Sequence, residues 1–333
     1  MTTRVAAIDC GTNSIRLLIA DIKSTEDDPE RVPGDSGPAP RSANPLADVR
    51  REMRIVRLGE GVDRTGRLSE AALDRTMIAL REYAGMIAEA RPVAVRMVAT
   101  SATRDAANAQ EFTGQVRDIL GIEPEVISGE EEAWLSFTGA TRELAGTGLA
   151  ADCAPPYLVT DIGGGSTEFI LGGPEGVEGE RSVNIGCVRL TERHLHSDPP
   201  AQAEVLATIL DIEAALDQVA DALEVAKART LAGLAGSVTT VAAIALGLDA
   251  YDSERIHHAR IPAERVNEIA VDLLAMTRKE RAAIAVMHPG RVDVIGAGAL
   301  ILDRIMARFG FAEVLVSEHD ILDGIAWALA AGR

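Results

Sequence analysis

Apolar residues along the chain follow two different spacings. Short apolar runs at 158–160 and 169–171 flank the segment DIGGGSTE, which predicts a strand, a tight loop and a return strand. In two longer stretches, from about Ser69 to just before Pro92 and over residues 205–223, apolar residues recur every three or four positions. We therefore expect a hairpin around the glycines and two amphipathic helices that pack against a core.

Three consecutive glycines, Gly163, Gly164 and Gly165, lie at the centre of that hairpin. A run of glycine has a large conformational-entropy cost, and it is kept where φ must be positive or where another group must approach the backbone closely. A plain turn with no further function is the alternative.

The hairpin pattern occurs twice. Residues 5–20, VAAIDCGTNSIRLLIA, repeat the layout of strand, D-x-G-x-x-S and strand. A weaker repeat follows in each half, because VRMVATSATR (95–104) and LAGLAGSVTT (231–240) each have the pattern of a buried strand that ends at a helix start. Helix N-termini bind phosphate through free N–H groups. We expect two related lobes that clamp a phosphate chain from both sides.

Hairpin geometry brings two carboxylates together. If the loop is centred on the middle of the glycine run, Asp161 and Glu168 lie directly opposite each other, with Cβ atoms about 5 Å apart. A hard cation such as Mg²⁺ between or near them would explain why two repelling charges are placed there. In the first copy the equivalent pair is Asp9 and Arg16, which suits an anion. The alternative is that Asp161 only caps the turn and Glu168 is solvated.

An acidic helix start is predicted in EVISGEEEAW (125–134). Ser128 is the expected N-cap, and Glu131 stands at the capping-box position three residues later. Glu130 and Glu132 are then left without a structural role, unless they only interact favourably with the helix dipole.

Length, composition and charge limit the kinds of protein that this chain can be. A length of 333 residues suits two domains, and residues 24–50, rich in proline and charge, are expected to form a flexible surface insertion. The net charge of −18 argues against nucleic acid or an anionic membrane as a partner. The N-terminus is unlike a signal peptide and no uncharged apolar run of about 18 residues occurs, so we expect a cytoplasmic protein. The three cysteines have no spacing typical of a disulfide framework or a zinc site.

An ordered set of motifs carries a resemblance to a known family. The chain contains, in order, DCGTNSIRL, ATSATR, ISGEEEA, DIGGGSTE, GCVRLTE, HPGRVDVIGAGAL and VSEHDILDGIA. This set resembles the exopolyphosphatase/guanosine pentaphosphate phosphohydrolase (Ppx/GppA) family from residue 5 to about residue 325. The resemblance implies an α/β fold with two ribonuclease-H-like lobes of the actin-like, sugar-kinase-like superfamily around a central cleft. It places residues 1–128 and about 312–333 in the N-terminal lobe and residues 129–311 in the C-terminal lobe, and it implies a homodimer.

The same resemblance implies roles for individual residues. Glu132 matches the catalytic base that activates the attacking water. Asp161 and Glu168 match metal-associated carboxylates for Mg²⁺, or Mn²⁺, and Asp9 is placed in the same metal-binding set. The expected phosphate-binding residues come from both lobes: Asn13, Ser14, Arg16, Ser101, Arg104, Gly163, Gly164, Gly165, Ser166, Gly236 and Ser237.

The function implied is hydrolysis of the terminal phosphoanhydride of inorganic polyphosphate, which releases orthophosphate. Hydrolysis of pppGpp to ppGpp is the first alternative, because both substrates present a terminal phosphoanhydride to the same loops. A kinase of the same superfamily is the second alternative, and an inactive nucleotide-sensing pair of lobes is a third.

Two further expectations concern residues near the motifs. Cys187 is expected near the site without a function, and Arg291 and Asp293 are expected to form a local ion pair.

Overall fold

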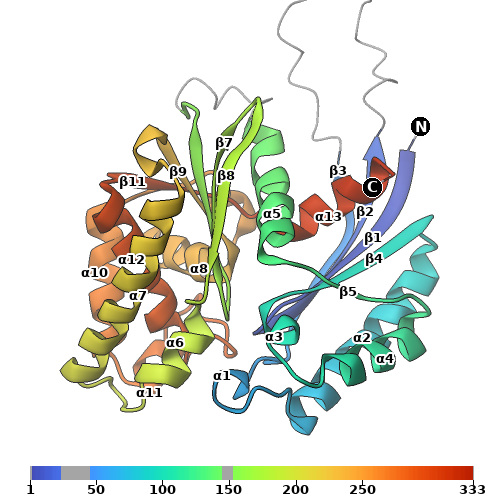
Figure 1. Cartoon of the computed structure of the whole chain (residues 1–333), viewed down its shortest axis with the longest axis horizontal. Coiled ribbons are helices and arrows are strands. Elements are labelled where there is room, and N and C mark those ends of the chain that lie inside the picture. The colour runs from blue at the N-terminus through green and yellow to red at the C-terminus, as the bar shows by residue number, and fades with distance from the viewer. Residues whose placement is uncertain (1, 24–45, 145–152, 333) are drawn as a thin grey trace, which may run out of the picture.

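The computed structural model describes residues 2–23, 46–144 and 153–332, and it contains two mixed β-sheets with helices around them (Figure 1). The strand order is β3-β2-β1-β4-β5 in the first sheet and β10-β11-β9-β6-β7-β8 in the second. In both sheets an antiparallel three-stranded meander, β3-β2-β1 or β8-β7-β6, is followed by a parallel strand, β4 or β9. This shared order confirms the predicted α/β class and fits the predicted duplication.

The first sheet and its helices come from the N-terminal part of the chain, and we call them the first lobe. The strands are β1 (Thr2–Cys10), β2 (Ser14–Lys23), β3 (Leu46–Ile55), β4 (Ala94–Ala99) and β5 (Glu125–Val126). The helices are α1 (Val62–Thr65), α2 (Glu70–Ala90), α3 (Ser101–Arg104) and α4 (Ala109–Leu120). As predicted, Ser69 is the N-cap of α2, and its hydroxyl accepts a hydrogen bond from the N–H of Ala72 at 3.3 Å.

The second sheet and its helices form the second lobe. The strands are β6 (Tyr157–Ile162), β7 (Thr167–Gly173), β8 (Gly176–Val183), β9 (Thr230–Leu234), β10 (Arg260–Pro262) and β11 (Glu313–Val316). The helical segments are α6 (Cys187–His194), α7 (Gln202–Ala222), η3 (Val225–Lys227), α8 (Ala235–Ala245), α9 (Ser253–Ile256), α10 (Ala263–Ala275), α11 (Arg278–Ala282) and α12 (Ile295–Phe309). The long helix expected over residues 205–223 is α7, which begins three residues earlier.

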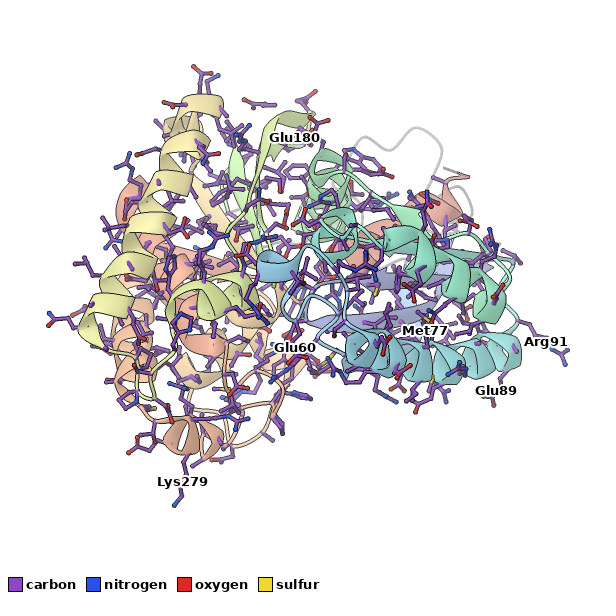
Figure 2. All side chains as sticks on the ribbon, turned by 60° about the horizontal axis from the view of Figure 1, so that its bottom comes forward. Glu60, Met77, Glu89, Arg91, Glu180 and Lys279 are labelled. Atoms are coloured by element: carbon purple, nitrogen blue, oxygen red, sulfur yellow. The ribbon has the colours of Figure 1, made fainter. Side chains whose placement is uncertain are left out.

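Each lobe has its own apolar core. Met77 and Phe112 are buried between the first sheet and its helices, and Phe169 and Leu216 are buried in the second lobe. Figure 2 shows that the charged residues at the outer end of α2, such as Glu89, extend away from the molecule. None of the helices in the described ranges has a stretch long and apolar enough to cross a bilayer.

Two predicted boundaries need correction. Residues 46–50, expected in the flexible insertion, are the first half of β3, while residues 24–45 lie outside the described part of the chain. β3 is an edge strand held by backbone pairing to β2, so its polar side chains can stay exposed and its sequence shows no apolar period. Residues 313–316, expected in the N-terminal lobe, form β11 beside β9 in the second sheet. The other boundaries of the two-domain division stay predictions.

The predicted strand registers are confirmed. Asp161 pairs with Glu168 across β6 and β7, and Asp9 pairs with Arg16 across β1 and β2. Because the side chains of directly opposed residues point to the same face of a sheet, each hairpin presents one charged pair.

Helices α5 (Gly129–Leu144) and α13 (Ile321–Ala330) connect the two lobes, and Figure 1 shows them between the sheets. α5 packs on the second sheet, α13 packs on the first, and the two helices pack against each other. A Cβ atom on Gly139 would lie 1.9 Å from the carbonyl oxygen of Asp320, and one on Gly324 would lie 2.0 Å from that of Leu135. The helix backbones can approach this closely only because both positions are glycine.

Replacing Gly139 by alanine should therefore destabilise the protein. The added methyl group must push α13 away, because the atom that it meets belongs to the backbone, and overpacking of this kind costs about 1–3 kcal/mol. Gly85→Ala is the matched control, since Gly85 lies in α2 with no atom within 4 Å of its added Cβ. Thermal unfolding should show a lower transition for G139A and an equal or higher one for G85A. An unchanged transition for G139A would contradict the proposed close contact.

Candidate active site

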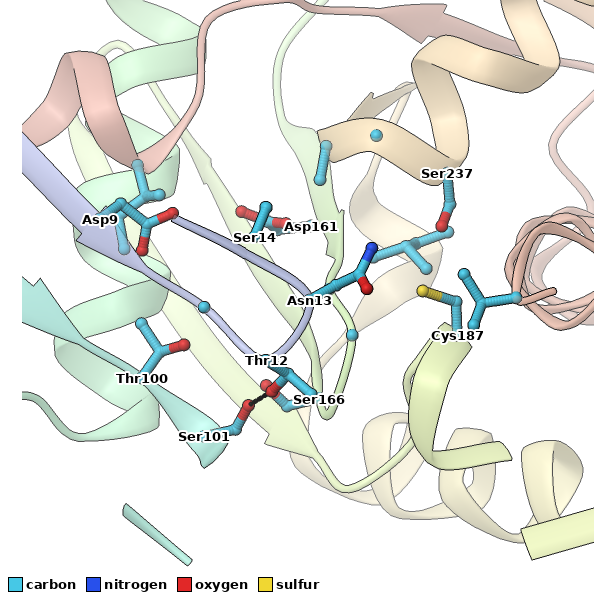
Figure 3. A pocket seen from close by; sticks show the side chains of 18 of the residues that line it. Asp9, Thr12, Asn13, Ser14, Thr100, Ser101, Asp161, Ser166, Cys187 and Ser237 are labelled. Atoms are coloured by element: carbon cyan, nitrogen blue, oxygen red, sulfur yellow. Dashed lines mark hydrogen bonds between the residues drawn. The ribbon is translucent and has the colours of Figure 1, made fainter. Parts of the chain in front are cut away.

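A small cavity lies where the loops of the two hairpins meet the starts of α3 and α8 (Figure 3). Its volume is about 90 Å³, and we call it the cleft cavity. Polar side chains and glycines from both lobes form most of its wall: Asp9, Gly11, Thr12, Asn13, Ser14, Arg16, Thr100, Ser101, Glu132, Asp161, Gly163, Gly164, Ser166, Cys187, Gly236, Ser237 and Arg291.

The glycine run allows the two hairpin loops to touch. A Cβ on Gly164 would lie 2.9 Å from Cβ of Thr12, and one on Gly165 would lie 2.7 Å from Oγ of Ser101. Within the described residues, the positions with positive φ do not include Gly163, Gly164 or Gly165. Close approach, rather than an unusual backbone conformation, is therefore the reason for glycine here. Figure 3 shows Thr12 and Ser101 joined by their hydroxyl groups, whose oxygens are 2.9 Å apart.

Helix α5 positions two of the acidic groups. Glu132 and Ser136 are one turn apart on its inner face, where Ser136 donates a hydrogen bond to Oδ2 of Asp161 at 2.8 Å. Arg104 donates to Oε2 of Glu132 at 3.2 Å. On the neighbouring strand, Glu168 accepts a hydrogen bond from the hydroxyl of Ser182 at 2.8 Å. Each carboxylate is thus held by a donor from another element.

Burial raises the pKa of all three carboxyl groups. Desolvation is the main cause for Asp161, whose pKa rises to about 6, and the nearby Asp320 adds to it. The pKa of Glu168 rises to about 8, through burial and the charge of Asp161. Burial, together with the charge of Glu168, also holds the pKa of Glu132 well above its ordinary value, although Arg104 opposes this. A site that raises the pKa of neighbouring acids is suited to accept protons or a cation.

Arg16 joins the first hairpin to the end of the chain. Its guanidinium donates to Oδ2 of Asp9 at 2.7 and 3.0 Å and also forms an ion pair with Asp320, the N-cap residue of α13. Burial alone would raise the pKa of Asp320, but Arg16 holds it below its ordinary value. Sequence analysis missed Asp320, although the motif VSEHDILDGIA contains it, because its partner lies about three hundred residues away.

Arg291 has a different environment from the one expected. Its guanidinium is half-buried, lines the cleft cavity, and donates hydrogen bonds to the carbonyl of Gly236 and, at 3.0 Å, to the hydroxyl of Thr240. The predicted ion pair with Asp293 is wrong, because Asp293 binds Arg57 at 2.8 Å and also Arg278. The structure pairs Arg291 with a carbonyl and a hydroxyl rather than with a carboxylate, so its positive charge faces the cavity.

The two helix starts contribute differently. α3 has only four residues, and its side of the cavity is formed by the hydroxyls of Thr100 and Ser101. α8 is longer and begins at Ala235, whose φ of 65° is in the left-handed region that non-glycine residues rarely adopt. This strained turn points Gly236 and Ser237 at the cavity.

Charged side chains of α6 also join the two lobes beside the cleft cavity. Arg189 on α6 donates to the carbonyl of Gly165 at 2.6 Å and forms ion pairs with Asp63 and Asp105 of the first lobe. Glu192 on the same helix accepts from the backbone N–H of Gly61 at 3.1 Å. These contacts therefore hold the two lobes together beside the cavity.

Most of the predicted site residues line this cavity. Three of them do not line it. Arg104 and Glu168 lie behind Glu132 and Asp161, and Gly165 packs against Ser101 instead. The roles assigned to the individual residues stay predictions. Thr12, Thr100 and Arg291 were missed. Thr12 and Thr100 could have been predicted from the sequence, because each is next to a residue that the motifs place in the site.

Two further observations concern ligands. Among the described residues, no three Asp, Glu, His or Cys side chains converge as a ready-made metal site. Oδ1 of Asn13, at the wall of the cavity, is buried and has no hydrogen-bond partner in the part of the chain that the structure describes. Buried polar atoms are nearly always satisfied, so this position is suited to a ligand or a water molecule that belongs to the site.

Comparison with known proteins shows which family the chain belongs to. The Ppx/GppA phosphatase family model matches residues 39–330. A Mycobacterium tuberculosis protein named Exopolyphosphatase 2 is 48% identical over 98% of this chain and 99% of its own length. The crystal structure of an exopolyphosphatase-like protein has 41% identity and a TM-score of 0.88, and the match covers 99% of both chains. An Aeromonas salmonicida protein named guanosine-5′-triphosphate,3′-diphosphate pyrophosphatase is 27% identical over 97% of this chain and 59% of its own length. The chain belongs to the Ppx/GppA phosphatase family.

Proposed function

We propose that this protein hydrolyses the terminal phosphoanhydride bond of inorganic polyphosphate and releases orthophosphate. The observation that carries the proposal is the position of Glu132. It is a buried carboxylate with a raised pKa, in a cavity whose other walls offer hydroxyls, glycine backbone and guanidinium groups. These are the groups that bind a phosphoryl group and stabilise the charge that develops on it.

The relatives support polyphosphate as the substrate. The Mycobacterium tuberculosis relative matches this chain over nearly its full length and is named an exopolyphosphatase. Hydrolysis of pppGpp is the second candidate, favoured by the name of the Aeromonas salmonicida relative, which is a longer protein. A kinase is disfavoured because the family is a phosphatase family. The expectation of a cytoplasmic protein rests on the sequence, and the expectation of a homodimer rests on the resemblance to the family.

The geometry suggests how the reaction proceeds. The terminal phosphoryl group lies in the cleft cavity against the loop Gly163–Ser166, with Arg291 and Ser237 on the other side. A water molecule held by Glu132 attacks the phosphorus, and its proton passes to the Glu132 carboxylate. The bond from phosphorus to the bridging oxygen breaks as the new P–O bond forms, so the shortened chain leaves with the electron pair. Arg104 orients Glu132 for this step, because it donates to its carboxylate.

A divalent cation fits the site. Mg²⁺ is commonly held by one or two carboxylates together with water and substrate phosphates, so three converging protein ligands are not required. Asp161 would hold it at the cavity wall, with Glu168 behind, and the unpartnered Oδ1 of Asn13 could bind a water of its shell. When bound, the cation would supply positive charge that offsets the charge of the phosphate groups. Asp9 is less available than predicted, because Arg16 occupies one of its oxygens.

Glu132→Gln should abolish most hydrolysis while leaving substrate binding. The amide keeps the shape of the side chain but cannot take the proton, and loss of a general base typically lowers kcat about 10²–10⁴-fold. Release of orthophosphate from polyphosphate, pppGpp and ATP should be measured for each protein. Glu130→Gln is the matched control, since Glu130 is an exposed neighbour on the same helix turn. A wild-type rate for E132Q would show that Glu132 is not the base.

Without a divalent cation, the stability of the protein should fall as pH rises. The folded-state pKa values of Asp161 and Glu168, about 6 and about 8, exceed the ordinary values of about 4. Their stabilising contribution is therefore complete below about pH 4 and is lost as pH rises through 6 and 8. Thermal unfolding in a chelator should show this decline, and Mg²⁺ at pH 8 should raise the transition again.

The control for this effect is a pair of substitutions. Glu168→Gln should remove the part of the decline between about pH 6 and pH 8, because an amide does not titrate. Exposed Glu175, changed to Gln, should leave the profile as in the wild type. If E168Q and the wild type declined equally, the buried carboxylates would not be its source.

A further inference from the structure

Helix α6 lies against residues 163–166, the loop between β6 and β7, which we call the glycine loop. The N–H groups of Cys187 and Arg189, in the first turn of α6, donate to the first two carbonyls of the loop at 3.0 Å. Gly186, the N-cap of α6, allows this approach, because a Cβ there would lie 2.4 Å from the carbonyl oxygen of Gly164. The start of α6 therefore holds the carbonyl side of the glycine loop.

The side chain of Arg189 holds the third carbonyl. Its Nε donates to the carbonyl oxygen of Gly165 at 2.6 Å, and its terminal nitrogens bind Asp63 and Asp105 of the first lobe. These two carboxylates keep the guanidinium in one orientation and offset its charge. The side chain is only 11% exposed, and Arg189 is not among the residues that line the cleft cavity. Arg189 is therefore placed to orient the loop rather than to bind a ligand.

These carbonyl contacts determine where the N–H groups of the loop point. In a planar trans peptide the carbonyl and the N–H point in opposite directions. The N–H groups of Gly164, Gly165 and Ser166 therefore point away from α6, and within the described part of the chain none of the three donates to another protein group. Ser166 is buried and lines the cleft cavity (Figure 3). Because buried N–H groups are nearly always satisfied, the N–H of Ser166 is suited to a ligand in that cavity.

We propose that Arg189 is a positioning residue for phosphate binding, which directs the N–H of Ser166 into the cleft cavity by holding the carbonyl of Gly165. The N–H then donates to an oxygen of the bound phosphoryl group. Without a donor at the carbonyl, this peptide can rotate, because Gly165 has no Cβ to restrict it, and the carbonyl dipole then repels the anion. The proposal rests on the proposed function only in placing a phosphoryl group in the cleft cavity.

Three substitutions of Arg189 separate its hydrogen bond from its ion pairs. Arg189→Gln keeps a donor but loses the charge, because the amide nitrogen of glutamine is as many bonds from the backbone as Nε. Arg189→Lys keeps the charge near Asp63 and Asp105 but has a carbon atom at the position of Nε. Arg189→Met has a carbon atom at that position and no charge.

Binding of inorganic phosphate to each variant is measured by calorimetry. R189Q should bind phosphate within about threefold of the wild type. R189K and R189M should bind it about tenfold more weakly, the effect of losing one hydrogen bond to a charged group. Arg193→Met is the matched control, since Arg193 lies on the same helix and pairs with Asp63, at 2.9 Å, and with Asp211. R193M should bind phosphate as the wild type does.

Three results would overturn the proposal. The first is that R189K and R189M bind phosphate as tightly as the wild type. The second is that R189Q binds as weakly as R189M, because the charge would then matter rather than the hydrogen bond. The third is that R193M binds as weakly as R189M, because contact between the lobes would then be the cause.

Two further points keep the outcome clear. Thermal unfolding shows whether each variant is folded, and if R189M is not, the comparison of R189K with R189Q gives the same test. Phosphate binding involves no bond cleavage. A wild type that binds phosphate but does not hydrolyse polyphosphate would therefore count against the proposed function alone.

Discussion

The site depends on a close contact between the two lobes, in which the glycine loop of the second hairpin has no side chains of its own and packs against side chains of the first lobe. Gly164 faces Thr12, Gly165 faces Ser101, and a Cβ on Gly186 would lie 2.4 Å from the carbonyl oxygen of Gly164. Helices α5 and α13 approach each other in the same way, through Gly139 and Gly324. Larger residues at these positions would separate the lobes, and the walls of the cleft cavity belong to both lobes. Close approach of the backbones therefore brings residues of both lobes to the wall of one cavity.

The buried charges follow from this closure. Glu132, Asp161 and Glu168 lose most of their hydration when the lobes meet, and their pKa values rise. Burial of several carboxylates beside one another destabilises a fold unless cations offset the charge. The arrangement is therefore not explained by a contribution to stability alone. It is well suited to a site that takes up a divalent cation and a proton from water. Arg291 forms no ion pair with a carboxylate within the described ranges and donates to the carbonyl of Gly236 and the hydroxyl of Thr240 at the wall of the cavity.

Local patterns in the sequence predicted a large part of this arrangement. The registers that pair Asp161 with Glu168 and Asp9 with Arg16 follow from the period of two in a strand and the centre of each loop, which are local features. The start of α2 at Ser69 follows from its capping residue. Three results were not predictable in this way: β3 begins at Leu46 as a polar edge strand, β11 pairs with the second sheet, and Arg291 turns toward Gly236 rather than Asp293. Each depends on contacts between residues far apart in the chain.

The central claim is that water positioned by Glu132 attacks the terminal phosphorus of a phosphate chain held in the cleft cavity. Hydrolysis of polyphosphate in ¹⁸O-labelled water tests it most directly, with the position of the label read by mass spectrometry or ³¹P NMR. The account predicts that the label from each hydrolytic event appears in the released orthophosphate. Label in the end group of the shortened chain would mean that water attacks the next phosphorus, and it would contradict the placement of the terminal phosphoryl group beside Glu132.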